Sequence, residues 1–101
     1  MINMNIVLTD SVEKYLNNLT KAERNQVLKK INMAFLLQGR SDGDLIAHLE
    51  GKVNYIRRPG QHRLFFLLKG DMIIFFAYYK KSQKLPERVK EKIVTLAKKF
   101  L

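Results

Sequence analysis

The sequence has no cysteine, only two prolines and only nine acidic residues among 101. The absence of cysteine excludes a disulfide framework, a thiol nucleophile and a thiolate metal site. The longest apolar run, residues 72–79, is too short to cross a bilayer, and the first residues lack the pattern of an export signal. We therefore expect a cytoplasmic protein without a membrane partner. A chain of this length folds around one core, so residues 1–101 are expected to form a single domain.

The acidic residues are scarce in only one half of the chain. Residues 1–50 contain six Lys/Arg and six Asp/Glu, whereas residues 51–101 contain thirteen Lys/Arg and three Asp/Glu. The whole formal charge of +10 therefore lies in the second half. Such a surface attracts polyanions, among which nucleic acid is the commonest, followed by anionic lipid and acidic proteins. A basic surface that serves only solubility is an equally simple interpretation, because charge does not determine fold or chemistry.

The first half of the chain predicts one strand and two helices. Residues 5–8, of which the last three are apolar, indicate a short strand. The stretches Asp10-Ser11-Val12-Glu13 and Thr20-Lys21-Ala22-Glu23 have the pattern of capping boxes, so each is expected to begin a helix. Apolar residues follow both at helical spacing: Val12, Leu16 and Leu19, then Val27, Leu28, Ile31, Ala34, Phe35 and Leu37. Gly39 is a natural end for the second helix of this hairpin.

The second half predicts three strands and a final helix. Three strand-like runs, residues 53–58, 62–68 and 72–79, are separated by short turns that contain glycine, which favours an antiparallel meander. In the last two runs, apolar residues occupy both odd and even positions, which point to opposite faces of a strand. Both faces of those strands should therefore be covered. The helical hairpin can cover one face. A helix that begins at Pro86, its expected first helical residue, can cover the other with Val89, Ile93, Leu96, Ala97 and Phe100.

These elements define an α+β fold with the order β-α-α-β-β-β-α. We expect a mainly antiparallel sheet packed against an N-terminal helical hairpin, with a C-terminal helix. Within this frame the stretch YIRRPGQHRLFFLLKGDMIIFFAYYKKSQKLP resembles the RelE/ParE toxin superfamily, most closely its HigB-like, phage-derived branch. The resemblance covers residues 45–100 well and residues 5–40 only through the order of elements. Leu85 departs from it, because a small polar residue is expected before the proline.

This resemblance implies a RelE-like fold and the toxin of a type II toxin–antitoxin system. For this branch it implies ribosome-dependent cleavage of mRNA, with no metal and no small-molecule cofactor. The implied partners are mRNA on the ribosome and a cognate antitoxin. Because the toxin is so basic, we expect an acidic antitoxin segment that lies across the basic strands or displaces the C-terminal helix.

The residue types suit RNA cleavage. RNA carries its own nucleophile, the 2′-hydroxyl, so the protein needs to position the strand and stabilise charge at phosphorus. Arginine matches two phosphate oxygens at once, and tyrosine can stack on an unpaired base. The candidate catalytic residues are Arg63, Arg57, His62 and Lys80. The candidate RNA-binding residues are Tyr79, Tyr78, Lys81, Arg58 and Lys84.

Each candidate also has a structural interpretation. Arg63 could form a strand-end ion pair with Glu50 or Asp71. Arg57 shares its strand face with Tyr55, whereas Arg58 points to the opposite face. Histidine exchanges protons near neutral pH, so His62 is the natural acid or base, yet a turn histidine is often exposed and idle.

Several choices stay open at the level of sequence. Tyr78 and Tyr79 alternate, so one covers the core and the other faces the basic side, and Lys80 and Lys81 have the same ambiguity. His48 is expected to be structural and to lie in a loop. The cations in and just before the last helix are expected to be solvated or to attract RNA generally: Lys84, Arg88, Lys90, Lys92, Lys98 and Lys99.

Two other functions fit the same resemblance. A ParE-like toxin would bind DNA gyrase without catalysis, and a basic module would bind nucleic acid without toxicity. The presence of both Arg57 and Arg63 favours cleavage, because a protein-binding toxin does not require convergent phosphate ligands.

Overall fold

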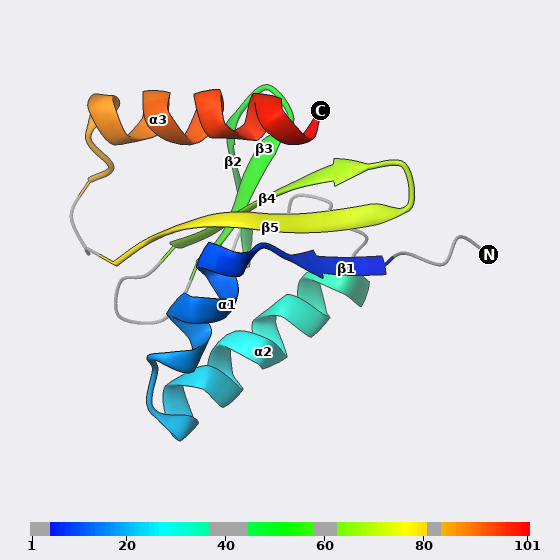
Figure 1. Ribbon diagram of the computed structural model, residues 1–101, viewed down its shortest axis with the longest axis vertical. Coiled ribbons are helices and arrows are strands. Elements are labelled where there is room, and N and C mark those ends of the chain that lie inside the picture. Colours follow the sequence, from blue (N-terminus) through cyan, green and yellow to red (C-terminus); the bar gives the residue numbers. More distant parts are fainter. Residues whose placement is uncertain (1–4, 37–44, 58–62, 81–83) are drawn as a thin grey trace.

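A computed structural model describes residues 5–36, 45–57, 63–80 and 84–101, and it shows one five-stranded sheet with helices on both faces (Figure 1). The elements in chain order are β1 (Asn5–Leu8), α1 (Asp10–Asn17), α2 (Lys21–Leu36), β2 (Ile46–Glu50), β3 (Val53–Arg57), β4 (Arg63–Lys69), β5 (Met72–Tyr79), α3 (Glu87–Ala97) and a 3₁₀ turn, η1 (Lys98–Phe100). The α+β class with a mainly antiparallel sheet is confirmed. None of the described helices is long and apolar enough to span a membrane.

The predicted order lacks one strand, β2. This strand forms an edge of the sheet, so its burial alternates instead of forming a continuous apolar run. It also follows the polar stretch 39–44, which hid its start. The placement of His48 in a loop is consequently wrong, because His48 lies within β2 and pairs with Asn54.

The strand order is β1-β5-β4-β3-β2. Strands β2 to β5 form an antiparallel meander, and β1 adds to β5 in parallel. The β2–β3 and β4–β5 turns place Gly51 and Gly70 at φ 56° and 59°, a conformation that glycine adopts without steric cost. These turns set the register that aligns the opposite ends of the strands.

Each face of the sheet has its own core, as expected because β4 and β5 have apolar residues on both faces. Helices α1 and α2 cover the core that contains Phe66 and Phe75, and α3 covers the core that contains Phe65 and Phe76 (Figure 1). In α3, Ile93 and Ala97 are buried, and the other three apolar residues predicted to pack there are half-buried against the same core.

The helix starts agree only in part with the predicted capping boxes. The box of α2 is confirmed, because the Glu23 N–H donates to Thr20 Oγ1 at 3.2 Å and the Thr20 N–H donates to Glu23 Oε1 at 3.1 Å. The box of α1 is wrong: Thr9 is the N-cap, and its backbone oxygen already accepts the Glu13 N–H at 2.9 Å. Pro86 is likewise the N-cap of α3, just before its first turn.

One residue predicted to be buried in α2 is exposed, and the predicted end of this helix cannot be compared with the structure. Leu28 was expected in the buried stripe but is 38 % exposed, because α1 and the sheet already cover the stripe that contains Val27 and Ile31. Leu37 and Gly39 lie outside the described residues.

A β-bulge in β5 decides where its last two tyrosines point. Phe65 pairs with Ala77 and Phe66 pairs with Phe75, so Phe76 is an extra residue in β5. Phe76 and Ala77 both contact the core beneath α3, which reverses the alternation beyond them. Tyr78 therefore lies on the face of α1 and α2, and Tyr79 on the face of α3.

Candidate functional site

The three central strands place two arginines and a tyrosine in one row where these strands end. Arg57 of β3 pairs with Arg63 of β4, and Arg63 pairs with Tyr79 of β5. Tyr55 precedes Arg57 by two residues and therefore lies on the same face. We call these four residues the Arg63 site: Tyr55, Arg57, Arg63 and Tyr79.

The guanidinium of Arg63 lies between two aromatic rings. Its Cζ is 5.9 Å from the centroid of the Tyr55 ring and 6.0 Å from that of the Tyr79 ring, within the range of cation–π attraction. The Tyr55 ring in turn packs at 5.4 Å and 53° against the buried ring of Phe65. Ring contacts on both sides restrict the orientation of the guanidinium, and its planar fork of N–H donors suits a phosphate.

The site concentrates positive charge where a ligand can reach it. Arg57 is exposed, and Arg63 and Tyr79 are half-buried. Two cations directly opposite each other on adjacent strands repel, so an anion that contacts both is favoured. Arg63 is thus partly buried yet accessible, as a phosphate ligand must be.

The carboxylates proposed as ion-pair partners of Arg63 lie elsewhere, so that interpretation is wrong. Asp71 is in the β4–β5 turn, beyond Lys69 and about 20 Å along β4 from Arg63. Glu50 pairs with Val53, at the other end of β3 from Arg57.

A second cation and tyrosine cluster occupies the opposite face of the sheet. The rings of Tyr15 in α1 and Tyr78 in β5 stack with centroids 4.4 Å apart and an interplanar angle of 14°. The Nζ of Lys80 lies 5.6 Å from each centroid. We call these three residues the Tyr15 cluster. The structure therefore does not bring Tyr78 and Lys80 to Arg63.

The remaining predicted residues are separate from this site or cannot be placed. Arg58, His62 and Lys81 lie outside the described residues. Lys84 is exposed in the segment before α3. His48 has its Nε2 2.8 Å from the backbone oxygen of Gly51, which supports the expected structural role at the β2–β3 turn.

Sequence reasoning missed the part played by two tyrosines. It placed Tyr55 on the same face as Arg57, but only the pairing of β3 with β4 shows that Tyr55 flanks Arg63. Tyr15 gave no signal beyond its place in a helix. Among the described residues, no group of three or more His, Asp or Glu side chains could hold a metal ion.

The comparisons with known proteins concern the fold. No protein-family model and no curated protein matches the sequence. The structure is similar to that of the E. coli toxin RelE, solved free with two arginines replaced by alanine, with a TM-score of 0.67, 15 % identity and full coverage of both chains. It is also similar to a chain of the archaeal RelE–RelB complex from Pyrococcus horikoshii OT3, with a TM-score of 0.64 and 19 % identity over 84 % of this chain and all of that one.

These likenesses place the protein in the α+β class, and its own geometry adds a basic site where the three central strands end. The fold is that of the RelE toxin structures, as the sequence predicted.

Proposed function

We propose that this protein is the toxin of a type II toxin–antitoxin system, of the HigB-like branch, and that it cleaves mRNA on the ribosome. The observation that carries the proposal is the row of Arg57, Arg63 and Tyr79 on adjacent strands, with Arg63 held between two tyrosine rings. The fold shared with RelE supports it, as does a net charge of +10 located in the half of the chain that builds the site.

The proposed reaction uses the nucleophile of the substrate. The 2′-hydroxyl oxygen attacks the adjacent phosphorus, the bond from phosphorus to the 5′-oxygen breaks, and a cyclic phosphate and a 5′-hydroxyl result. A general base takes the proton of the 2′-hydroxyl, and a general acid gives a proton to the leaving 5′-oxygen. His62 is the candidate that the sequence offers for these roles. Arg63 donates to the phosphate oxygens as negative charge grows there, and Arg57 supplies a second cation.

Tyr79 and Tyr55 position the strand in this proposal. A nucleotide splayed from its neighbours can stack its base on a tyrosine ring, which places its phosphate beside Arg63. The geometry favours a packing role for Tyr78 and Lys80, since both contact Tyr15 on the other face. Lys81, Lys84 and Arg58 would add general attraction for RNA.

The proposal includes a cognate antitoxin and a cytoplasmic site of action. The archaeal RelE was crystallised with RelB, which supports a protein partner for this chain also. An acidic antitoxin segment would bind the Arg63 site directly, so its affinity should fall as salt rises. An affinity that is independent of salt would contradict an electrostatic contact.

Brief induction in a bacterial host tests the function. Transcript 5′ ends are mapped by primer extension for the wild type, for Arg63→Ala and for Arg24→Ala, a control arginine in α2 on the other side of the sheet. The proposal predicts breaks within translated reading frames for the wild type and the control, and intact transcripts for Arg63→Ala.

The other outcomes separate the alternatives. Growth arrest with intact transcripts and inhibited gyrase supercoiling would indicate a ParE-like toxin. Normal growth together with RNA binding would indicate a basic nucleic-acid-binding module.

A further inference from the structure

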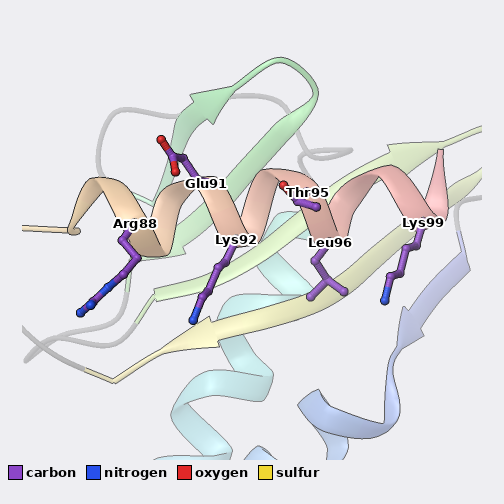
Figure 2. Close-up of a pocket in the computed structure, with 6 residues that line it drawn as sticks. All are labelled: Arg88, Glu91, Lys92, Thr95, Leu96 and Lys99. Atoms are coloured by element: carbon purple, nitrogen blue, oxygen red, sulfur yellow. The ribbon is translucent and has the colours of Figure 1, made fainter.

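The exposed face of α3 carries a row of cations that the Arg63 site does not include. A groove of about 450 Å³ runs along this face, and six residues line it: Arg88, Glu91, Lys92, Thr95, Leu96 and Lys99. Figure 2 shows Arg88, Lys92 and Lys99 extending to the same side of the helix, whereas Glu91 points to the other side. The row itself therefore has a single sign of charge.

The spacing of the row is fixed by the helix. Arg88 and Lys92 of α3 are four residues apart, and Lys99, in the η1 turn that continues the helix, follows seven residues later. These spacings correspond to rises of about 6 and 10 Å along the axis. All three side chains are exposed. They form a nearly straight line of positive charge about 16 Å long, enough to contact several consecutive charges of a linear polyanion.

The row and the Arg63 site lie on the same face of the sheet. Helix α3 follows β5 after a short connection and runs back over the sheet from the C-terminal end of β5 (Figure 1). Val89, next to Arg88, and Leu85, just before the helix, pack against the same core as Tyr55 and Tyr79. A strand bound at Arg63 can thus continue onto the first turn of α3.

We propose that Arg88, Lys92 and Lys99 bind the phosphodiester backbone of RNA that extends beyond the nucleotide held at the Arg63 site. This inference rests on the proposed function, because it takes RNA as the ligand of that site. A partner helix would need an apolar seam, and Leu96 is the one aliphatic residue among the six that line the groove. A sugar–phosphate backbone needs separated cations, which the row provides.

The test compares two triple variants that remove the same charge. Arg88→Gln/Lys92→Gln/Lys99→Gln neutralises the row, and Lys14→Gln/Lys21→Gln/Lys29→Gln neutralises three exposed lysines of α1 and α2 on the other side of the sheet. The probe is a fluorescent single-stranded RNA 12-mer with 2′-O-methyl groups, which cannot be cleaved by its own 2′-oxygen. Its Kd is measured by anisotropy between about 50 and 200 mM salt, a range that resolves phosphate contacts.

The row variant is expected to bind about tenfold more weakly than the control variant, with a slope of log K against log salt lower by about 2, because each lost phosphate contact on a single strand removes about 0.7. A parallel arm measures co-sedimentation with ribosomes. A loss specific to the row in both arms would assign the row to the strand bound at the Arg63 site and support the proposal. A loss with ribosomes alone would assign the row to ribosomal RNA and contradict it.

Two further results would overturn the proposal. Equal weakening by both variants in both arms would mean that only net charge matters. Unchanged RNA and ribosome binding by the row variant, with lost binding to a poly-glutamate peptide, would assign the row to an acidic protein. The 12-mer reports binding without cleavage, so the two proposals can fail separately. If the wild type does not cut transcripts but the row variant alone loses RNA binding, the nuclease is rejected and this inference stands.

Discussion

The same residue types form two different structures on the two faces of the sheet. At the Arg63 site, a cation has a tyrosine ring on each side, and the rings are 5.9 and 6.0 Å from it. In the Tyr15 cluster, two tyrosine rings stack directly at 4.4 Å and a lysine covers both. Rings stacked on each other leave no gap for a base between them, whereas Arg63 beside its two rings is only half-buried. A tyrosine and a cation at a strand end therefore do not define a site until their packing is known.

The bulge in β5 and the position of α1 produce this difference. Without the extra residue Phe76, strand alternation would exchange the faces of Tyr78 and Tyr79. Tyr78 would then lie near Arg63. With the bulge, Tyr78 stacks on the buried ring of Tyr15, and Tyr79 joins the arginine row. One residue of register separates the candidate site from the packed cluster.

The largest expected effect is on mRNA cleavage, and it distinguishes Arg63 from Lys80 of the Tyr15 cluster. Arg63→Ala should lower the rate of ribosome-dependent mRNA cleavage about 100-fold or more, as removal of one transition-state donor commonly does. Lys80→Ala should keep the rate within about threefold, because its ammonium lies over Tyr15 and Tyr78 rather than at the arginine row. The measurement is the single-turnover cleavage rate of a labelled mRNA. Equal losses in both variants would show that Lys80 also reaches the phosphate.

For stability, the Tyr15 cluster should matter more than the Arg63 site, the reverse of the order expected for cleavage. Tyr15 is 2 % exposed, so Tyr15→Ala should lower the free energy of unfolding by about 3 kcal/mol, as for other large buried aromatic side chains. Tyr55 is half-buried, and Tyr55→Ala should cost about 1 to 2 kcal/mol. Urea denaturation followed by circular dichroism measures both. If Tyr55→Ala proved the more destabilising, the main role of Tyr55 would be to pack in the core, and its contact with Arg63 would be secondary.

The sequence predicted the fold where local signals agree with one another. Alternating and continuous apolar runs located three strands of the meander, and helical periodicity located the three helices and the face that each covers. The edge strand β2 was missed because it has only five residues, two of which are His48 and Glu50, and it follows a polar turn region. An edge strand is specified by pairing with its neighbour, which a local pattern does not contain.

The candidate site was predictable as a set of residue types but not as an arrangement. Arg57 and Arg63 could be selected as phosphate ligands, and the shared face of Tyr55 and Arg57 followed from strand alternation. The choice between Tyr78 and Tyr79 could not be made, because it depends on the bulge at Phe76. A bulge inserts one residue inside an otherwise regular apolar run, so composition and period do not reveal it.

A smaller effect tests which tyrosine contacts RNA. Tyr79→Leu should weaken binding of the 2′-O-methyl RNA about tenfold, since stacking of one base is worth about 1 to 3 kcal/mol. Tyr79→Phe should restore most of the affinity, because the ring is kept. Tyr78→Leu, the matched change one residue earlier, should leave RNA affinity unchanged and lower stability instead. Anisotropy titrations of the three variants decide the point, and a loss of RNA affinity in Tyr78→Leu alone would reverse the assignment of the two faces.

The smallest expected effect concerns whether Lys80 belongs to the packed cluster. A double-mutant cycle with Lys80→Gln and Tyr78→Leu should give a coupling free energy of about 0.5 kcal/mol, typical of an exposed cation–π contact, since Lys80 is exposed and lies 5.6 Å from the Tyr78 ring. Lys80→Arg should keep that coupling, because a guanidinium also packs on a ring face. The four unfolding free energies come from urea titrations at constant salt. A coupling of zero would mean that the ammonium stays in water and that the contact does not hold Lys80 on the α1 face. Lys80 would then be free to turn toward the neighbouring strand end, where Tyr79 and Arg63 lie, and the contrast between the two faces would apply to the tyrosines alone.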